Sequence, residues 1–276
     1  MIVIKEGVTF QDFYKVLFEN QKVSWDAAIL NRVEESYSFL QDFAKNKVIY
    51  GVNTGFGPMA QYQIEAHDQL SLQYNLIRSH ASGTGKIMEP LYVKSLMLAR
   101  LNTLGLGKSG VHKSVIEVMT QLLNKEITPL IFEHGGVGAS GDLVQLAHLA
   151  LVLIGEGEVF YQGKRCKTKE IFEQENMQPI QIKGREGLGL MNGTSAMTGI
   201  GIVNTIYAKR LLNWSVAASS LINELVQAYD DHFSEQLNAA KKHKGQQEIA
   251  RRMRAHLKDS QLIKSRVQHL YNPKQE

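Results

Sequence analysis

The segment from Thr194 to Tyr229 constrains the fold more than any other part of this sequence. It contains no proline, and its apolar residues fall on most faces of an α-helix. A helix that is apolar nearly all round must be surrounded by other helices. The segment therefore predicts a helical-bundle core, which several subunits could share.

The rest of the chain is also mainly helical in pattern. Its 276 residues suffice for one large domain or two small ones, and five prolines are few. We expect a mainly α fold, a long-helix bundle with a small mixed N-terminal portion. Residues 1–185 are expected to form the N-terminal region. Residues 186–276 are expected to begin the central bundle, whose remainder is absent from this sequence.

Short signals mark several predicted elements. Thr9 is a candidate N-cap for a first helix, and Pro90 suits the first turn of another. Val159–Tyr161, followed by Gln162-Gly163, predicts a small hairpin. The tripeptide Val-Ile-Tyr at 48–50 is short and prone to form a strand, and it runs straight into a glycine-rich loop.

Charge and cysteine content argue against several classes of protein. The net charge of +4 owes much to basic residues near the C-terminus, but acidic residues interrupt them and no aromatic residues interleave for base stacking. We therefore expect a solvated helix face and no nucleic-acid partner. The lone Cys166 favours a reduced compartment, and so a cytoplasmic location. The basic residues in question are Lys241, Lys242, Lys244, Arg251, Arg252 and Arg254.

Neither a membrane nor a metal is indicated. The longest uncharged run, Gly187 to Ala208, is long enough to span a bilayer, but it carries several Asn, Ser and Thr residues and five glycines. A buried helix in a soluble bundle fits it better. The nine histidines show no His-x-x-x-His or Glu-x-x-His pairing with a credible third ligand, so no metal site is predicted.

Three glycine-rich segments stand out: Tyr50–Gly57, Gly135–Asp142 and Leu190–Thr194. The first is reminiscent of a phosphate-binding loop, but it lacks both the Gly-Lys-Ser/Thr ending and the Gly-x-Gly-x-x-Gly spacing. Considered one at a time, each segment is more simply explained as a turn that needs glycine for backbone reasons.

In this order and spacing, however, the three segments resemble the signature segments of the aromatic amino acid ammonia-lyases. Gly136–Leu143 resembles the segment of the histidine, phenylalanine and tyrosine enzymes in which Ala139, Ser140 and Gly141 would cyclise autocatalytically into a methylidene-imidazolone. The resemblance covers essentially the whole chain and implies the long-helix bundle of the ammonia-lyase and fumarase type. The likeness is greatest to the bacterial tyrosine ammonia-lyases, which are substantially longer than this chain.

The residue types suit that cyclisation. Ring closure requires the amide nitrogen of Gly141 to attack the carbonyl carbon of Ala139, and small residues at both positions limit obstruction. Gly138 allows the backbone to bend into conformations that a β-carbon would forbid. Loss of water then leaves Ser140 as a methylidene carbon, an electrophile that acts as an electron sink and that no standard side chain supplies.

The resemblance implies roles for three further residues. Asp142 would assist the cyclisation, although an N-cap for the helix expected over Leu143–Ile154 is an equally good interpretation and does not exclude the first. Tyr50 would be the base that removes a β-proton, which needs nearby positive potential such as a helix N-terminus. Asn192 would contact the reaction intermediate or the imidazolone carbonyl. From the residues alone, a core-packing aromatic at a strand end is a better interpretation of Tyr50 than a catalytic base, and Asn192 could be a buried structural amide.

Ser79 and His80 lie in the segment that resembles the family's ring-recognition region. A histidine can hydrogen-bond to a tyrosine hydroxyl or an imidazole nitrogen, and a polar pocket disfavours phenylalanine. A Ser-His pair is common in histidine ammonia-lyases, yet the whole-chain likeness favours L-tyrosine, giving trans-p-coumarate. The alternatives are L-histidine, giving urocanate, and a tyrosine aminomutase. The resemblance also makes Gly57 and Leu143 substrate-binding residues, and Gln61 could line the ring pocket or simply be an exposed loop residue.

A carboxylate-binding arginine cannot be named. In the family it comes from a Tyr-Ser-Leu-Arg segment, which does not occur in this sequence. We therefore expect the chain to be incomplete relative to its functional unit and inactive alone, and the resemblance implies a homotetramer. An alternative of another class is a non-catalytic helical assembly protein that kept the scaffold. The intact Ala139-Ser140-Gly141 argues against it.

Overall fold

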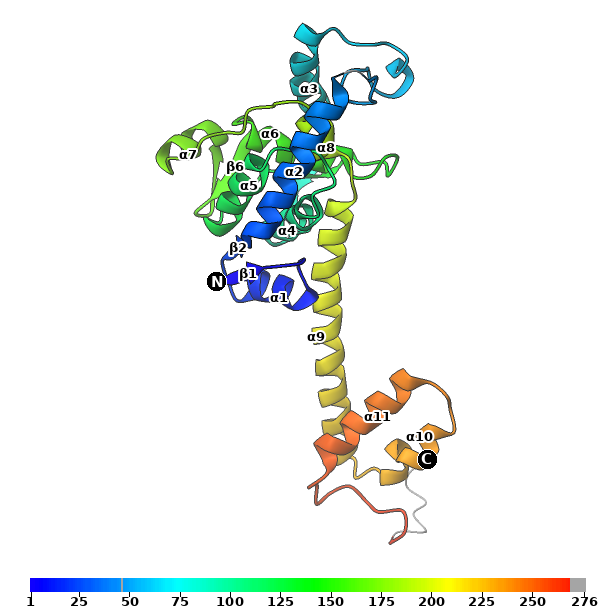
Figure 1. Ribbon diagram of the computed structural model, residues 1–276. Helices are drawn as coiled ribbons and strands as arrows, with labels where there is room; N and C mark the ends of the chain where they lie inside the picture. Colours follow the sequence, from blue (N-terminus) through cyan, green and yellow to red (C-terminus); the bar gives the residue numbers. More distant parts are fainter. Residues whose placement is uncertain (46, 269–276) are drawn as a thin grey trace. The chain divides into compact units, whose positions relative to one another are not determined.

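The computed structural model describes residues 1–45 and 47–268 (Figure 1). The chain is mainly helical, as predicted, and divides into two compact units, Met1–Asn204 and Thr205–Glu276. In chain order the elements are β1 (Ile2–Ile4), α1 (Phe10–Phe18), β2 (Val23–Trp25), α2 (Ala27–Ala44), η1 (Gly57–Met59), α3 (Ala66–His80), β3 (Thr84–Ile87), α4 (Pro90–Gly105), α5 (Ser114–Asn124), β4 (Thr128–Pro129), β5 (Phe132–His134), α6 (Leu143–Leu153), β6 (Glu158–Tyr161), β7 (Lys164–Lys167), α7 (Thr168–Gln174), α8 (Glu186–Met191), α9 (Ser195–Leu225), η2 (Asp230–Phe233), α10 (Glu235–Ala239) and α11 (Lys244–Leu257).

Helix α4 lies at the centre of the first unit. Pro90 begins it, as predicted, because the first turn does not use the backbone N–H that proline lacks. Every residue from Ser95 to Leu101 is buried, and α1, α2 and α5 all contact the helix. Burial on so many sides makes α4 a rigid support for the segments packed against it.

Helices α3, α6 and α8 contact one another pairwise beside this core. The sequence of α6 is almost wholly apolar, and Leu146 to Ala150 are all buried. The C-terminal end of α3 carries the Ser79-His80 pair, α6 follows the Gly135–Asp142 segment, and α8 ends at Asn192. The three helices therefore bring predicted site segments from distant parts of the sequence into one region.

The strands are few and short. Strands β1 and β2 form a parallel pair, β3 and β5 an antiparallel pair, and β4, β6 and β7 a small antiparallel sheet. The predicted hairpin is confirmed as β6 and β7, joined by Gln162 and Gly163 with φ of 49° and 75°.

The strand expected at residues 48–50 is wrong. The Asn53 side chain accepts a hydrogen bond from the Ile49 N–H at 2.7 Å, and the Asn53 N–H donates to the Ile49 carbonyl at 3.2 Å. These local bonds fold the segment into a turn, because a short polar side chain offers the backbone an alternative to strand pairing.

Helix caps account for two further outcomes. The N-cap predicted at Thr9 is confirmed, since Thr9 Oγ1 accepts from the Asp12 N–H at 3.2 Å while the Asp12 carboxylate accepts from the Thr9 N–H at 2.9 Å. Asp142 does occupy the N-cap position of α6, as predicted, but its side chain makes no cap bond there. The carboxylate instead accepts from the Met197 N–H at 2.8 Å, in the first turn of α9.

Helix α9 is the longest helix of the described residues and appears in yellow in Figure 1. It confirms the long helix predicted from Thr194 onward. Beyond Asn204, many of its large apolar side chains are exposed, so the described residues do not complete the surrounding bundle that the sequence predicts. None of the described helices is long and apolar enough to cross a membrane. The exposed apolar residues include Leu211, Leu212, Trp214, Leu221, Ile222 and Leu225.

The second unit has a small core of its own, made by Phe233, Ala250 and Leu257. Its basic residues make ordinary surface and helix-end contacts. Arg251 pairs with Glu248 at 2.7 Å, and Arg254 donates to the Phe233 carbonyl at 2.7 Å. These contacts fit the solvated helix face predicted for this segment.

Candidate active site

The Ala139–Gly141 segment forms a tight turn that fits the predicted cyclised group. The Gly141 N–H donates to the Gly138 carbonyl at 3.5 Å, and Gly138, Ser140 and Gly141 have φ of 75°, 62° and 92°. A serine in the left-handed region is strained, and such strain persists only where the surroundings impose it. The turn folds the Gly141 amide nitrogen back toward the preceding peptides, which is the bend that ring closure requires.

Gly193 lies directly against this turn. Its carbonyl accepts from the Asp142 N–H at 2.8 Å, and a β-carbon added to Gly141 would lie 2.2 Å from the same carbonyl oxygen. Asn192, next to Gly193, is therefore brought to the turn. The Asn192 side chain is exposed, so its interpretation as a buried structural amide is wrong.

The Tyr50 side chain is held by other residues of its own loop. Its phenol oxygen accepts from the Gly57 N–H at 3.2 Å, and its ring stands edge-on to Phe56 with the centroids 6.2 Å apart. The side chain is 50% exposed, so Tyr50 is not the core-packing residue that its position alone suggested. Gly57 has φ of 55°, a left-handed conformation that glycine adopts at low cost.

Gln73 joins the Tyr50 loop to the helix that precedes Asn192. It is fully buried, its Nε2 donates to the Gly51 carbonyl at 3.1 Å, and its Oε1 accepts from the Leu188 N–H at 3.2 Å. Sequence reasoning missed this residue, because a glutamine in a partly polar helix looks like a surface residue.

His80 is held in one tautomer at the end of α3. Its Nδ1 lies 2.9 Å from the Leu76 carbonyl oxygen. A carbonyl oxygen only accepts, so Nδ1 carries a proton, and in the neutral ring Nε2 is then a hydrogen-bond acceptor. Ser79 Oγ donates to the same carbonyl at 3.1 Å, which fixes the neighbouring side chain as well.

Gly83 ties the Ser79-His80 segment to the glycine-rich loop. Its N–H donates to Nε2 of the buried His148 at 3.1 Å, and burial lowers the pKa of His148. A β-carbon added to Gly135 would lie 3.3 Å from the Gly83 Cα, so the two backbones are in close contact. The pairing of β3 with β5 holds the same two segments together.

The remaining predicted substrate-binding residues are less closely involved. Leu143 is half-buried at the start of α6 and packs on the main core, next to the Ala139–Gly141 turn in sequence. Gln61 is exposed in the loop between η1 and α3. The contacts that join the other segments do not involve Gln61, so its role in a ring pocket stays a prediction.

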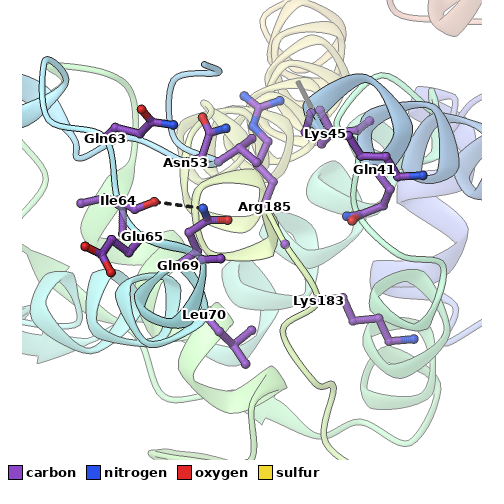
Figure 2. A pocket seen from close by; sticks show the side chains of 15 residues that line it. Gln41, Lys45, Asn53, Gln63, Ile64, Glu65, Gln69, Leu70, Lys183 and Arg185 are labelled. Atoms are coloured by element: carbon purple, nitrogen blue, oxygen red, sulfur yellow. Dashed lines mark hydrogen bonds between the residues drawn. The ribbon is translucent and has the colours of Figure 1, made fainter. Parts of the chain in front are cut away.

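A cavity of about 630 Å³ borders the Tyr50 loop at Val52 and Asn53 (Figure 2). The end of α2, the start of α3 and the segment before α8 form its other walls, and three cationic side chains line it: Lys45, Lys183 and Arg185. None of the residues predicted to be catalytic lines this cavity.

Comparison with known proteins identifies the family of the chain. Residues 8–274 match the family model described as aromatic amino acid lyase. The chain belongs to the aromatic amino acid lyase family.

Several members of the family resemble the chain over nearly its whole length. It is 38% identical over 271 residues to the histidine ammonia-lyase of Halalkalibacterium halodurans and 40% identical over 271 residues to that of Bacillus velezensis. Each match covers 96% of this chain and 53% of the relative. The structure of a tyrosine aminomutase from Streptomyces globisporus matches with a TM-score of 0.91 and 32% identity, over 97% of this chain and 51% of that one. The chain thus spans about half the length of the curated relatives it matches.

Proposed function

We propose that the protein to which this chain belongs eliminates ammonia from an aromatic L-amino acid, using an electrophile formed by cyclisation of Ala139, Ser140 and Gly141. The observation that carries this proposal is the left-handed turn at Ser140 and Gly141, pressed against Gly193. The methylidene-imidazolone would supply an electrophilic carbon for the substrate amine, without a metal.

Three surrounding residues are proposed to remove the β-proton, to contact the reacting groups and to support ring formation. Tyr50 is the proposed base for the β-proton, and its loop is kept in place through Gln73. Asn192 is proposed to contact the reacting groups, since Gly193 brings it to the Ala139–Gly141 turn. Asp142 supports ring formation by holding the end of the turn to the first turn of α9.

The ring of the substrate should carry a hydrogen-bond donor, because His80 offers Nε2 as an acceptor. L-tyrosine and L-histidine both meet this condition, and L-phenylalanine does not. The sequence alone favoured L-tyrosine, and the likeness to a tyrosine aminomutase structure supports keeping it. The histidine ammonia-lyases at 38–40% identity, together with the Ser79-His80 pair, support L-histidine as the first candidate.

The complete assembly is part of the proposal. A chain of about half the length of its relatives, with exposed apolar residues along α9, is expected to need the remaining part of the polypeptide and further copies. We expect a homotetramer, located in the cytoplasm. Residues 1–276 alone are expected to be inactive, because the family's carboxylate-binding arginine segment does not occur among them.

The test is an assay of the protein as purified from its native source, with L-histidine, L-tyrosine and L-phenylalanine side by side. Ultraviolet absorbance distinguishes urocanate from p-coumarate, and chromatography of the amino acids detects a β-amino acid formed by an aminomutase. Urocanate as the main product supports L-histidine, and p-coumarate supports L-tyrosine. The absence of all these products, with Ser140 uncyclised by peptide mass spectrometry, would overturn the proposal.

A further inference from the structure

Arg100 is a buried cation to which the proposed function gives no task. It lies in the middle of α4 and is 2% exposed, between fully or nearly fully buried apolar residues. Burial lowers the pKa of Arg100 to about 10, and the charge of Asp142 acts in the opposite direction. The guanidinium is therefore charged at neutral pH, and burying such a charge is costly unless polar groups receive it.

The groups that receive it belong to the end of α8. Arg100 Nη2 donates to the Asn192 carbonyl at 2.9 Å and also to the Gly189 carbonyl. The last carbonyls of a helix have no partner within the helix, and a cation there is favourable. At this point Asn192 leaves the helix with φ of −82° and ψ of 116°, and its side chain is exposed.

The same guanidinium is packed against Gly193. A β-carbon at Gly193 would lie 2.3 Å from Arg100 Nη1, so any other residue at position 193 would displace the guanidinium. The Gly193 carbonyl in turn holds the Asp142 N–H, directly after the Ala139–Gly141 turn. A shift of the guanidinium would thus reach both Asn192 and the turn.

A purely structural cap would look different. Arg32 donates Nε and Nη2 to the Gly105 carbonyl at 3.2 and 2.7 Å, at the end of α4, and touches none of the predicted site segments. Like Arg100, Arg32 donates its guanidinium N–H groups to a carbonyl at a helix end, but that helix end is remote from the predicted site segments. Arg32 is therefore the matched control for the loss of an arginine at a helix end.

We propose that Arg100 is a positioning residue for this site, whose guanidinium ends α8 and holds the Asn192–Gly193 backbone in the geometry that the Ala139–Gly141 turn requires. This inference rests on the proposed function. It predicts that Arg100 acts through Asn192 and on ring formation, in addition to any contribution to stability.

The experiment uses the native-length protein with Arg100→Met, Arg100→Lys, Arg32→Met, Asn192→Ala and the double variant of Arg100→Met with Asn192→Ala. Mass spectrometry of the peptide that contains Ser140 measures the loss of water, thermal unfolding measures stability, and kinetics separate kcat from KM. We expect both Arg→Met variants to lose stability. Only Arg100→Met should cyclise slowly and lose kcat by about a hundredfold with little change in KM, as a small misplacement can produce.

The double variant and the lysine variant decide how Arg100 acts. If Arg100 works through Asn192, the double variant has nearly the kcat of Asn192→Ala alone, once each kcat is divided by the cyclised fraction that mass spectrometry gives. Lysine keeps the charge but not the planar fork, so Arg100→Lys should cyclise several-fold more slowly than wild type, and it carries the test if Arg100→Met does not fold. Wild-type cyclisation and wild-type kcat in Arg100→Met would overturn the inference. If only Arg100→Lys folds, the same result in that variant would overturn it. Fully additive effects of Arg100→Met and Asn192→Ala on kcat in the double variant would also overturn it. A wild-type protein that never cyclises would instead overturn the proposed function.

Discussion

The carboxylate of Asp142 accepts a hydrogen bond from the Met197 N–H at 2.8 Å. Asp142 directly follows the Ala139–Gly141 turn, and Met197 lies in the first turn of α9, the longest helix of the described residues. The first N–H groups of a helix lack internal partners and carry partial positive charge, so they stabilise a carboxylate. The acid after the turn is thus tied to the start of α9, which begins at Ser195, two residues after Gly193.

Replacing Asp142 by alanine should remove the hydrogen bond from the Met197 N–H and, with it, the support of the Ala139–Gly141 turn. We expect a loss of about 1 kcal/mol in the free energy of unfolding, the usual cost of a lost cap. We also expect cyclisation of Ser140 to slow by an order of magnitude or more. Denaturant unfolding and peptide mass spectrometry of the native-length protein measure the two effects.

Thr9→Ala is the control for this change, because Thr9 is part of a capping box at α1. It should cost a similar amount of stability and leave cyclisation unchanged. Equal cyclisation in the Asp142 and Thr9 variants would mean that the Met197 contact has no part in ring formation.

Gly141→Ala should prevent the turn from forming. The new β-carbon would lie 2.2 Å from the Gly193 carbonyl oxygen, at a φ of 92° that L residues rarely adopt. Gly163→Ala adds the same strain at φ of 75° in the β6–β7 hairpin, where nothing lies within 4 Å of the new atom. We expect uncyclised Ser140 in the first variant and full cyclisation in the second. Normal cyclisation in Gly141→Ala would show that this packing is not required.

The long helix and the position of the turn were predictable from sequence, and the contacts that join the segments were not. Helix α9 is recognisable because a local pattern, apolar residues without proline, determines it. Asp142 illustrates the opposite case. Its position after Gly141 made it a good candidate cap for α6, but its partner is Met197, 55 residues further along the chain, and no local rule points there.

Buried polar residues within helices were the main omission. Gln73 and Arg100 are both almost inaccessible to solvent, and each bonds backbone groups of segments remote in sequence. Pattern analysis assigns a polar residue in a helix to the surface. Arg100 did carry a signal, since it interrupts the apolar run of α4. Gln73 carried one too, because Leu76 and Ile77 follow it by three and four residues and share its helix face.

Gln73→Leu should disturb the Tyr50 loop. The change keeps the residue's approximate size but leaves the Gly51 carbonyl and the Leu188 N–H without partners in a buried place, at a cost of about 1–3 kcal/mol each. We expect lower stability, together with a lower kcat in the native-length protein, because the loop carries the proposed base. Gln69→Leu is the control, since Gln69 donates only to the nearby Ile64 carbonyl. The same kcat for both variants would contradict a positioning role for Gln73.

Stability of the first unit should fall as the pH drops below about 6.5, and His148 should be a cause. Burial lowers the pKa of His148 from its ordinary value of 6.5, so the folded protein favours the neutral ring whose Nε2 accepts from the Gly83 N–H. Between the folded pKa and 6.5 the unfolded chain binds more protons than the folded one, and stability therefore rises with pH in that window. The contribution is fully present above 6.5 and is lost as the pH falls toward the folded pKa.

Amide hydrogen exchange at Gly83 and denaturant unfolding across this pH range test the assignment. A glutamine can still accept from Gly83 but does not titrate, so His148→Gln should flatten the decline and keep Gly83 protected at low pH. His67→Gln, which alters a histidine whose side chain is 71% exposed, should leave Gly83 exchange unchanged. Because Gly83 joins the Ser79-His80 segment to Gly135, its exposure at low pH should also weaken substrate binding before the unit unfolds. An unchanged pH dependence in His148→Gln would place the titrating group elsewhere.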